Sequence, residues 1–283
     1  MAFRNQDPRS EPGQPGAVVA PKAAEAAGGG SIVNISPSGD TAGATDAAAL
    51  NAALAAGQAV QLVPGTYYVN ATIEVPAHGV VRGAGRDSFG SPYVTTIQAV
   101  GALPAVIASA GWVENTNTNG LNGTDLSCFT VDGNNTAANG IILQTFDGRV
   151  DNVSVMNTSW GGITWCTLSD NQEVEIGGTI NLSNNRVTNC VVSNCAGPGI
   201  GTSESSTSDT YTDGYCLFNI VANCGSGIFI QQSADWLVMG NHVQTHGMAR
   251  RHRPRANSLT PTHWWSRTRP RRTSPTWPAP GTR

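Results

Sequence analysis

The stretch GIILQTFDGRVDNVSVMNTSWGGI, residues 140–163, holds the feature that decides the fold. It begins and ends with a Gly-Ile pair, and the two pairs, at Gly140 and Gly162, are 22 residues apart. Two more Gly-Ile pairs follow at Gly199 and Gly227. A repeat of roughly 20–50 residues is typical of a solenoid, in which each coil stacks on the one before it. The sequence therefore predicts stacked coils, each with one Gly-Ile strand.

A second repeat, Asn-x-Val-x-x-Cys/His, begins at Asn185, Asn219 and Asn241. Each Asn lies two residues before a Val, so in a strand both side chains face inward. Stacked Asn side chains can hydrogen-bond from coil to coil, and Asn also tolerates the left-handed backbone of tight corners. Cys190 and Cys224 hold the same place in this repeat, so we expect them to stack in a ladder.

The chain has six cysteines, at positions 128, 166, 190, 195, 216 and 224. There is no CxxC pair and no Cys/His spacing of a zinc site, so no metal site is predicted. The main interpretation is that they are small buried side chains. Their even number leaves disulfides open as an alternative.

A short helix is predicted before the first strands. Thr45 or Asp46 supplies the N-cap or a favourable first-turn charge, Leu50 and Leu54 share one face, and Gly57 ends the helix. Short β-branched runs follow at residues 60–63, 66–69, 72–75 and 79–83. No helical pattern separates these runs, which favours an all-β fold over a doubly wound sheet.

The Gly-Ile spacing widens twice along the chain. Gly162 and Gly199 are 37 residues apart, and Gly199 and Gly227 are 28 apart, which exceeds 22 by 15 and 6 residues. The extra residues fit directly after a Gly-Ile strand, at 166–180 and 203–214. Insertions after the same strand of neighbouring coils project from one face, which is often the binding face. We therefore expect the functional site on this face.

The two ends differ in composition from the middle. Residues 1–30, rich in Pro, Gly, Ala and charge, are expected to be a disordered arm. Residues 1–247 hold 7 Lys+Arg and 19 Asp+Glu, a net charge of −12, whereas residues 248–283 hold 9 Arg and no acid, a net charge of +9. The six Pro of this tail exclude further coils. The predicted domain is therefore 31–247, followed by a basic tail at 248–283.

The basic tail has three interpretations. It could be an arm that binds nucleic acid or an anionic polysaccharide, or an ordinary disordered tail. The preferred interpretation is a shifted reading frame near codon 248, in which case no nucleic-acid partner is implied and coils that complete the solenoid are missing. No membrane span is visible, and the N-terminus lacks the apolar core of a secretory signal. An extracellular or virion-associated location is still expected from the fold type.

Several segments resemble the pectate lyase superfamily. They are GDTAGATDAAAL at 39–50, VPGTY at 63–67, RGAG at 82–85 and FTVDGN at 129–134. The resemblance implies a right-handed parallel β-helix whose first coil is capped by a short helix. It leaves the chemistry open, because the superfamily includes polysaccharide lyases, hydrolases, epimerases and phage tailspikes. It implies an extracellular, acidic, pectin-like polysaccharide as substrate.

The acidic insertions supply the candidate catalytic residues. A glycosidase needs two carboxylates roughly 5–10 Å apart, which side chains on coils stacked about 4.8 Å apart can provide. The candidates are Asp170, Glu204, Asp209 and Asp213. A lyase would instead need a base and a cation; the single Lys, Lys22, lies in the arm, and the insertions could hold Ca²⁺. Hydrolysis and β-elimination both stay open.

Substrate-binding candidates lie on or near the same strands. Trp165 and Trp236 could stack on sugar rings or fill the core, as could Trp160, and Gln231 is a further polar candidate. The rival to an enzyme is a structural or adhesive β-helix without activity, such as a tailspike-like module, or an inactive fragment. A tailspike-like module would favour a trimer, but the sequence does not fix the oligomeric state.

Overall fold

The computed structural model describes residues 31–86, 94–114, 116, 120–166, 181–203, 210–231 and 233–244. The predicted arm at 1–30 and the predicted tail at 248–283 lie outside the described residues, as does the domain boundary at 247.

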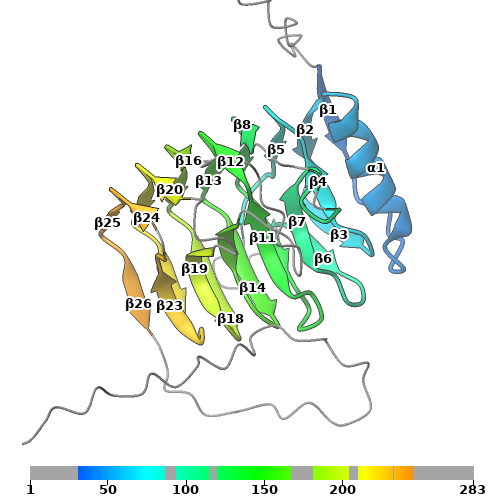
Figure 1. Cartoon of the computed structure of the whole chain (residues 1–283). Coiled ribbons are helices and arrows are strands. Elements are labelled where there is room, and N and C mark those ends of the chain that lie inside the picture. Colours follow the sequence, from blue (N-terminus) through cyan, green and yellow to red (C-terminus); the bar gives the residue numbers. More distant parts are fainter. Residues whose placement is uncertain are drawn as a thin grey trace, which may run out of the picture.

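Three parallel sheets run the length of the molecule (Figure 1). Sheet A contains β1 (Ile32–Ile35), β2 (Ala59–Leu62), β5 (Val80–Arg82), β9 (Asp125–Ser127), β13 (Arg149–Asp151), β17 (Arg186–Thr188), β21 (Tyr215–Leu217) and β25 (Leu237–Met239). Sheet B contains β3 (Gly65–Val69), β6 (Thr95–Ala99), β10 (Thr130–Asp132), β14 (Ser154–Thr158), β18 (Val191–Cys195), β22 (Ile220–Ala222) and β26 (His242–Gln244). Sheet C contains β4 (Ile73–Val75), β7 (Ala105–Ser109), β11 (Asn139–Leu143), β15 (Ile163–Cys166), β19 (Pro198–Ser203) and β23 (Ser226–Phe229).

Short strands between sheets C and A complete the coils. They are β8 (Leu121–Asn122), β12 (Thr145–Phe146), β16 (Asn181–Ser183), β20 (Thr210–Thr212) and β24 (Ser233–Ala234). The chain visits sheets A, B and C in turn, and each strand pairs in parallel with its counterpart one coil away. The predicted parallel β-helix is confirmed.

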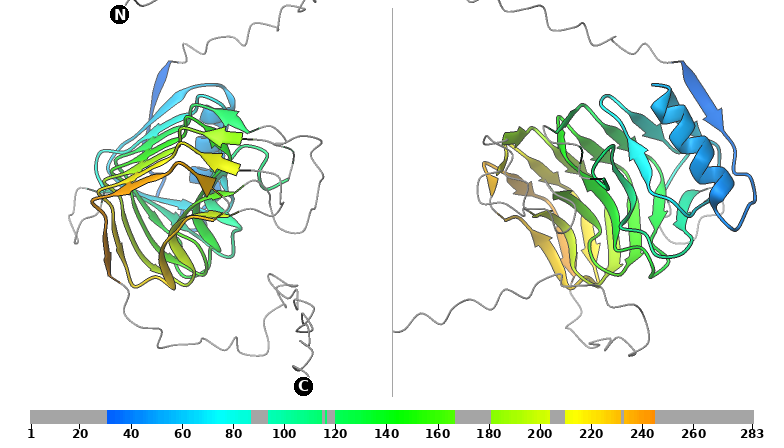
Figure 2. Two further views of the ribbon diagram at one scale, coloured as in Figure 1. Left: turned by 60° about the vertical axis from the view of Figure 1, so that its left-hand side comes forward. Right: turned by 45° about the vertical axis from the view of Figure 1, so that its right-hand side comes forward.

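Helix α1 (Ala44–Ala55) covers the first coil (Figures 1 and 2). Leu50 and Leu54 are buried, and Gly57 follows the helix with a φ of 72°, as predicted. Of the two roles predicted for Thr45 or Asp46, the first-turn charge is correct for Asp46, whereas the N-cap is Gly43, without a side-chain hydrogen bond. Asp46 is the first-turn acid, and its carboxylate is buried because it accepts backbone N–H bonds from outside the helix.

The Gly-Ile pairs are in register on sheet C, as predicted. The aligned residues are Ile73, Ile107, Ile141, Ile163, Ile200 and Ile228. The Gly before Ile leaves room for the following coil. A Cβ on Gly140 would lie 2.2 Å from Val155 Cγ1, and one on Gly162 would lie 2.4 Å from Val192 Cγ1. Only Gly therefore lets sheets B and C meet this closely.

Gly162→Ala is expected to lower the free energy of unfolding by about 1–3 kcal/mol, because the added methyl overpacks the contact with Val192. Urea unfolding followed by circular dichroism measures this. The control is Ser226→Ala, at an exposed position in the same sheet, with an expected change within about 0.5 kcal/mol. A Gly162→Ala protein as stable as the wild type would show that the coils can move apart without cost.

The inward asparagine stack is confirmed for two of its three predicted members. Asn219 Nδ2 donates a hydrogen bond to Asn241 Oδ1 at 2.9 Å. Asn185 lies instead at the corner that precedes sheet A, where its Oδ1 accepts bonds from Thr145 Oγ1 at 2.8 Å and from Gly148 N at 3.0 Å. Thr145 and Gly148 belong to the preceding coil, so buried Asn185 also bonds from coil to coil, but in a different row from Asn219 and Asn241.

The predicted ladder of Cys190 and Cys224 is wrong. Asn219 lies beside Cys190 and accepts a bond from its backbone N–H at 2.9 Å. Cys224 lies beside Cys195 instead, because the pairing of β18 with β22 continues in register to these positions. The interpretation as small buried side chains holds for four cysteines whose thiols are free, namely Cys190, Cys195, Cys216 and Cys224.

Three rows of tight corners separate the strands, and each row repeats a left-handed residue. The row before sheet A contains His78, Gly123, Asp147, Asn184, Asp213 and Asp235. The row between sheets A and B contains Cys128, Asn152, Asn189, Phe218 and Gly240. The row after sheet B includes Asn157, Asn194 and Asn223. Asn, Asp and Gly tolerate positive φ, so most of these side chains are explained by the corner itself.

The end of the stack opposite α1 exposes residues at core positions. Val238 and Val243 are each 45% exposed, whereas their partners one coil earlier, Cys216 and Val221, are fully buried. The inward position of Val243 is thus as predicted, but no described residue covers it. Within the described ranges, no helix has the length and apolar character needed to span a membrane.

Candidate functional site

One edge of sheet C carries extra chain in three coils. The length of this chain can be counted from the central Ile of each sheet C strand to the first residue of the following sheet A strand. This distance is 8 residues after β11, but 18 after β7, 23 after β15 and 15 after β19. The two insertions expected at 166–180 and 203–214 therefore do leave from the same edge. Residues 167–180 and 204–209 themselves lie outside the described residues.

The extra chain after β7, residues 110–114, is described and packs on the outer face of sheet C. Trp112 is buried against Ala105, Ala108 and Ile142 of β7 and β11. Its indole N–H has no hydrogen-bond partner among the described residues. Trp112 thereby fixes this segment against the sheet and places Glu114 in front of β4.

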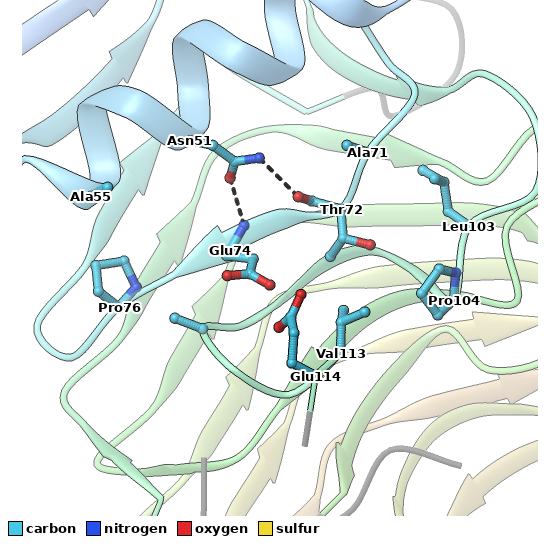
Figure 3. Close-up of a pocket in the computed structure, with 11 residues that line it drawn as sticks. Asn51, Ala55, Ala71, Thr72, Glu74, Pro76, Leu103, Pro104, Val113 and Glu114 are labelled. Atoms are coloured by element: carbon cyan, nitrogen blue, oxygen red, sulfur yellow. Dashed lines mark hydrogen bonds between the residues drawn. The ribbon is translucent and has the colours of Figure 1, made fainter. Parts of the chain in front are cut away.

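A pocket of about 550 Å³ lies between α1, β4 and residues 110–114 (Figure 3). It is lined by Asn51, Ala55, Ala71, Thr72, Glu74, Pro76, Leu103, Pro104, Ala110, Val113 and Glu114. The carboxyl groups of Glu74 and Glu114 point toward each other within it and are in hydrogen-bond contact. Glu74 is half-buried and Glu114 is exposed. None of the lining residues is basic.

Asn51 of α1 fixes the strand that carries Glu74. Its Oδ1 accepts a bond from Glu74 N at 2.8 Å, and its Nδ2 donates to Thr72 O at 3.0 Å. Strand β4 is the edge strand of sheet C, so Asn51 takes the place of a neighbouring strand. The Glu74 backbone is therefore held on both sides.

The environment of Glu74 favours its protonated form. Burial raises the pKa of the Glu74 carboxyl, and the hydrogen bond with Glu114 and the charge of Glu114 raise it further. A hydrogen bond from the backbone N–H of Gly111 opposes this rise only in part. Glu74 therefore keeps its proton to a higher pH than an ordinary glutamate.

This shift has a consequence for stability. A carboxyl whose pKa is raised in the folded state stabilises the fold below its unfolded pKa, and this stabilisation is lost as pH rises through the folded pKa. We expect Glu74→Gln to remove this loss, so the stability of the variant rises relative to that of the wild type as pH rises from about 4.5 through the raised pKa of Glu74. Urea midpoints of the two proteins across pH 4–8 would measure it, and parallel curves would contradict it.

Three of the four predicted catalytic acids, Asp170, Glu204 and Asp209, lie outside the described residues. Asp213 is exposed, with a φ of 53°, in the corner row before sheet A. It lies beside Asp235 of the next coil rather than on the outer face of sheet C. The described residues contain no group of three or more His, Cys, Asp or Glu that could hold a metal ion, such as the Ca²⁺ considered above.

The predicted sugar-binding side chains fall in different environments. Trp165 is fully buried, so no ring face is left for a sugar, and the structure gives it a core position instead. Trp236 is half-buried and meets Trp165 edge to face, with ring centroids 5.8 Å apart. Gln231 is half-buried, and its backbone N–H and C=O both bond to Thr202 Oγ1 at 2.8 Å. Trp160, at 46%, is the most exposed of the tryptophans that the structure describes.

Glu74 and Glu114 were missed by the sequence reasoning. The sequence does contain a signal that could have revealed them, namely the length of the coil after β7. This coil spans 34 residues from Ile107 to Ile141, 12 more than the 22-residue repeat. The Gly-Ile pattern did not include this coil, because Val106 precedes Ile107.

Comparisons with known proteins found similarity only to solved structures, at low sequence identity. No protein-family model and no curated protein sequence matches this chain. The A-module of the mannuronan C-5 epimerase AlgE4 of Azotobacter vinelandii is similar over 70% of this chain and 66% of the module, with 15% identity and a TM-score of 0.40. ORF18 of Geobacillus virus E2 is similar over 66% of this chain and 53% of that protein, with 12% identity and a TM-score of 0.23. The chain thus spans less than two thirds of either protein.

Proposed function

We propose that this protein binds and cleaves a polysaccharide, with Glu74 and Glu114 as its acid–base pair. The observation that carries the proposal is the contact of the two carboxyls in one pocket, where the pKa of Glu74 is raised. Two carboxyls held in different protonation states can divide the roles of acid and base at a glycosidic bond.

The roles follow from the two environments. Glu74, whose pKa is raised, donates a proton to the glycosidic oxygen that leaves. Glu114 stabilises the positive charge that develops on the sugar or activates the attacking water. Hydrolases of this kind hold their carboxyls about 5–10 Å apart, so substrate must separate this pair. Glu114 is the group that moves, because it is exposed and lies outside the strands, whereas Asn51 holds Glu74.

The pocket favours a neutral sugar chain over the acidic polysaccharide expected from the resemblance. Its charged lining residues are both acids, so a uronate would be repelled unless a cation lay between them. Leu103, Pro104 and Val113 supply apolar surface that suits the hydrogen-bearing faces of a sugar ring. Neutral glycans are therefore the first substrates to test.

The test is turnover by the full chain on a panel of neutral and acidic polysaccharides. New reducing ends without unsaturated products would support hydrolysis at this pair, and unsaturated products would support β-elimination. Turnover restricted to acidic polysaccharides in the presence of Ca²⁺ would overturn the neutral substrate. Binding without turnover of any substrate would overturn the enzyme and support the structural or adhesive alternative.

A further inference from the structure

Two cysteines on neighbouring coils lie side by side at the end of sheet B. Cys195 closes β18, and Cys224 follows β22 at the aligned position. Both side chains point inward, with exposed fractions of 2% and 5%. Each thiol packs against the Gly of a Gly-Ile pair: a Cβ on Gly162 would lie 3.2 Å from Cys195 Sγ, and one on Gly199 would lie 3.1 Å from Cys224 Sγ. The two thiols are therefore in equivalent places, one coil apart.

This placement meets the geometric requirement for a disulfide. Aligned residues of paired strands are about 4.8 Å apart, within the range of about 4.4–6.8 Å between the Cα atoms of bridged cysteines. The backbone hydrogen bond from Gly225 N to Cys195 O, at 3.0 Å, holds the two segments in this alignment. The thiols are also in mutual hydrogen-bond contact.

We propose that Cys195 and Cys224 are a disulfide site, which closes when the protein meets a disulfide oxidant and crosslinks two coils across residues 196–223. The Cys224 thiolate attacks a small-molecule disulfide such as oxidised glutathione, forms a mixed disulfide and releases one thiol. The Cys195 thiolate then attacks the Cys224 sulfur and releases the second thiol. Two electrons pass to the oxidant, and the two protons leave to solvent or to the released thiols.

The local environment distinguishes this pair from the other buried thiols. The hydrogen bond from Cys195 lowers the pKa of the Cys224 thiol, which favours the attacking thiolate. The same bond, together with burial, raises the pKa of the Cys195 thiol, so Cys195 loses its proton only as it attacks, after Cys224 has entered the mixed disulfide and the bond is gone. Burial raises the pKa of Cys190 and of Cys216 to about 12, so these thiols stay protonated and unreactive. The coil after Cys224 has exposed core positions such as Val243, so local opening there gives the oxidant access.

The test counts thiols in the full chain, reduced and then incubated with oxidised glutathione. After removal of the oxidant, denaturation and alkylation, we expect four alkylated cysteines instead of six, and a mass lower by two hydrogen atoms before alkylation. Chymotrypsin cleaves between the two positions, for example after Tyr211, Tyr215 or Phe218, so the crosslinked peptides can be identified. A count that stays at six, or a crosslink to another cysteine, overturns the proposal.

Matched variants separate the site from general oxidation. Cys190→Ser should still lose two thiols, from five to three, and Cys224→Ser should stay at five. Cys195→Ser should fall from five to four, because the mixed disulfide of Cys224 with glutathione then has no second thiol to resolve it. Oxidation should also raise the thermal midpoint of the wild type and leave that of Cys195→Ser unchanged, because the bond restricts the unfolded chain. Loss of two thiols in both Cys195→Ser and Cys224→Ser would overturn the assignment. If both variants fail to fold, the peptide map of the wild type decides alone.

Discussion

Asn219→Leu is expected to lower the free energy of unfolding by about 3–5 kcal/mol, because it leaves two buried backbone groups without partners. Asn219 is fully buried. Its Oδ1 accepts a bond from Cys190 N at 2.9 Å, and its Nδ2 donates to Val187 O at 3.1 Å and to Asn241 Oδ1 at 2.9 Å. Leu has the same branched arrangement of side-chain heavy atoms but can make none of these bonds, and its larger volume adds an overpacking cost at this buried position.

Urea unfolding of the full chain, followed by circular dichroism, measures this loss. The matched control is Asn223→Gly. Asn223 is exposed and has a left-handed backbone, with a φ of 54°. The hydrogen bond from its Nδ2 to Asn194 Oδ1 is long, at 3.4 Å. Gly adopts that conformation freely, so the expected change is within about 1 kcal/mol. If both variants lost the same free energy of unfolding, the buried hydrogen bonds of Asn219 would contribute no more to stability than an exposed corner residue does.

The same residue shows how far the sequence pattern reaches. Asn-x-Val predicts an inward Asn and an inward Val, and this is correct for Asn219 and Val221. The pattern around Asn185 is identical, but it belongs to sheet A rather than sheet B. Each coil contains several short strands with an inward Val, and a local pattern does not distinguish one from another. The error about Cys190 and Cys224 follows directly, since the pattern aligned two different sheets.

The residues of the candidate site could not be predicted from the sequence for a different reason. The insertions do leave from one edge of sheet C, as predicted, because they follow equivalent strands of neighbouring coils. Glu74 and Glu114, however, are 40 residues apart and lie in a part of the chain without Gly-Ile pairs. Their contact depends on Trp112 packing on β7 and β11 and on Asn51 reaching β4 from the helix. These are tertiary contacts without a repeating signal in the sequence.

Glu74→Gln is expected to lower turnover of a cleaved polysaccharide by about 10²–10⁴-fold, because the amide cannot donate the proton that the leaving oxygen needs. The wild type should lose activity as pH rises through the raised pKa of Glu74, since the acid is then ionised. The residual activity of Glu74→Gln should lack this alkaline fall. Glu114→Gln should lose activity as well, but the alkaline fall should remain, because Glu74 still titrates.

The matched control is Asp213→Asn, an acid-to-amide change at an exposed corner outside the pocket. Asn is as compatible with the left-handed backbone as Asp, so the fold should be unaffected and turnover unchanged. The measurement is initial rates for the three variants and the wild type from pH 4 to 9, with circular dichroism to verify folding. If Asp213→Asn abolishes turnover and Glu74→Gln does not, the catalytic acid is Asp213, as the sequence predicted, and the pair in the pocket has another role.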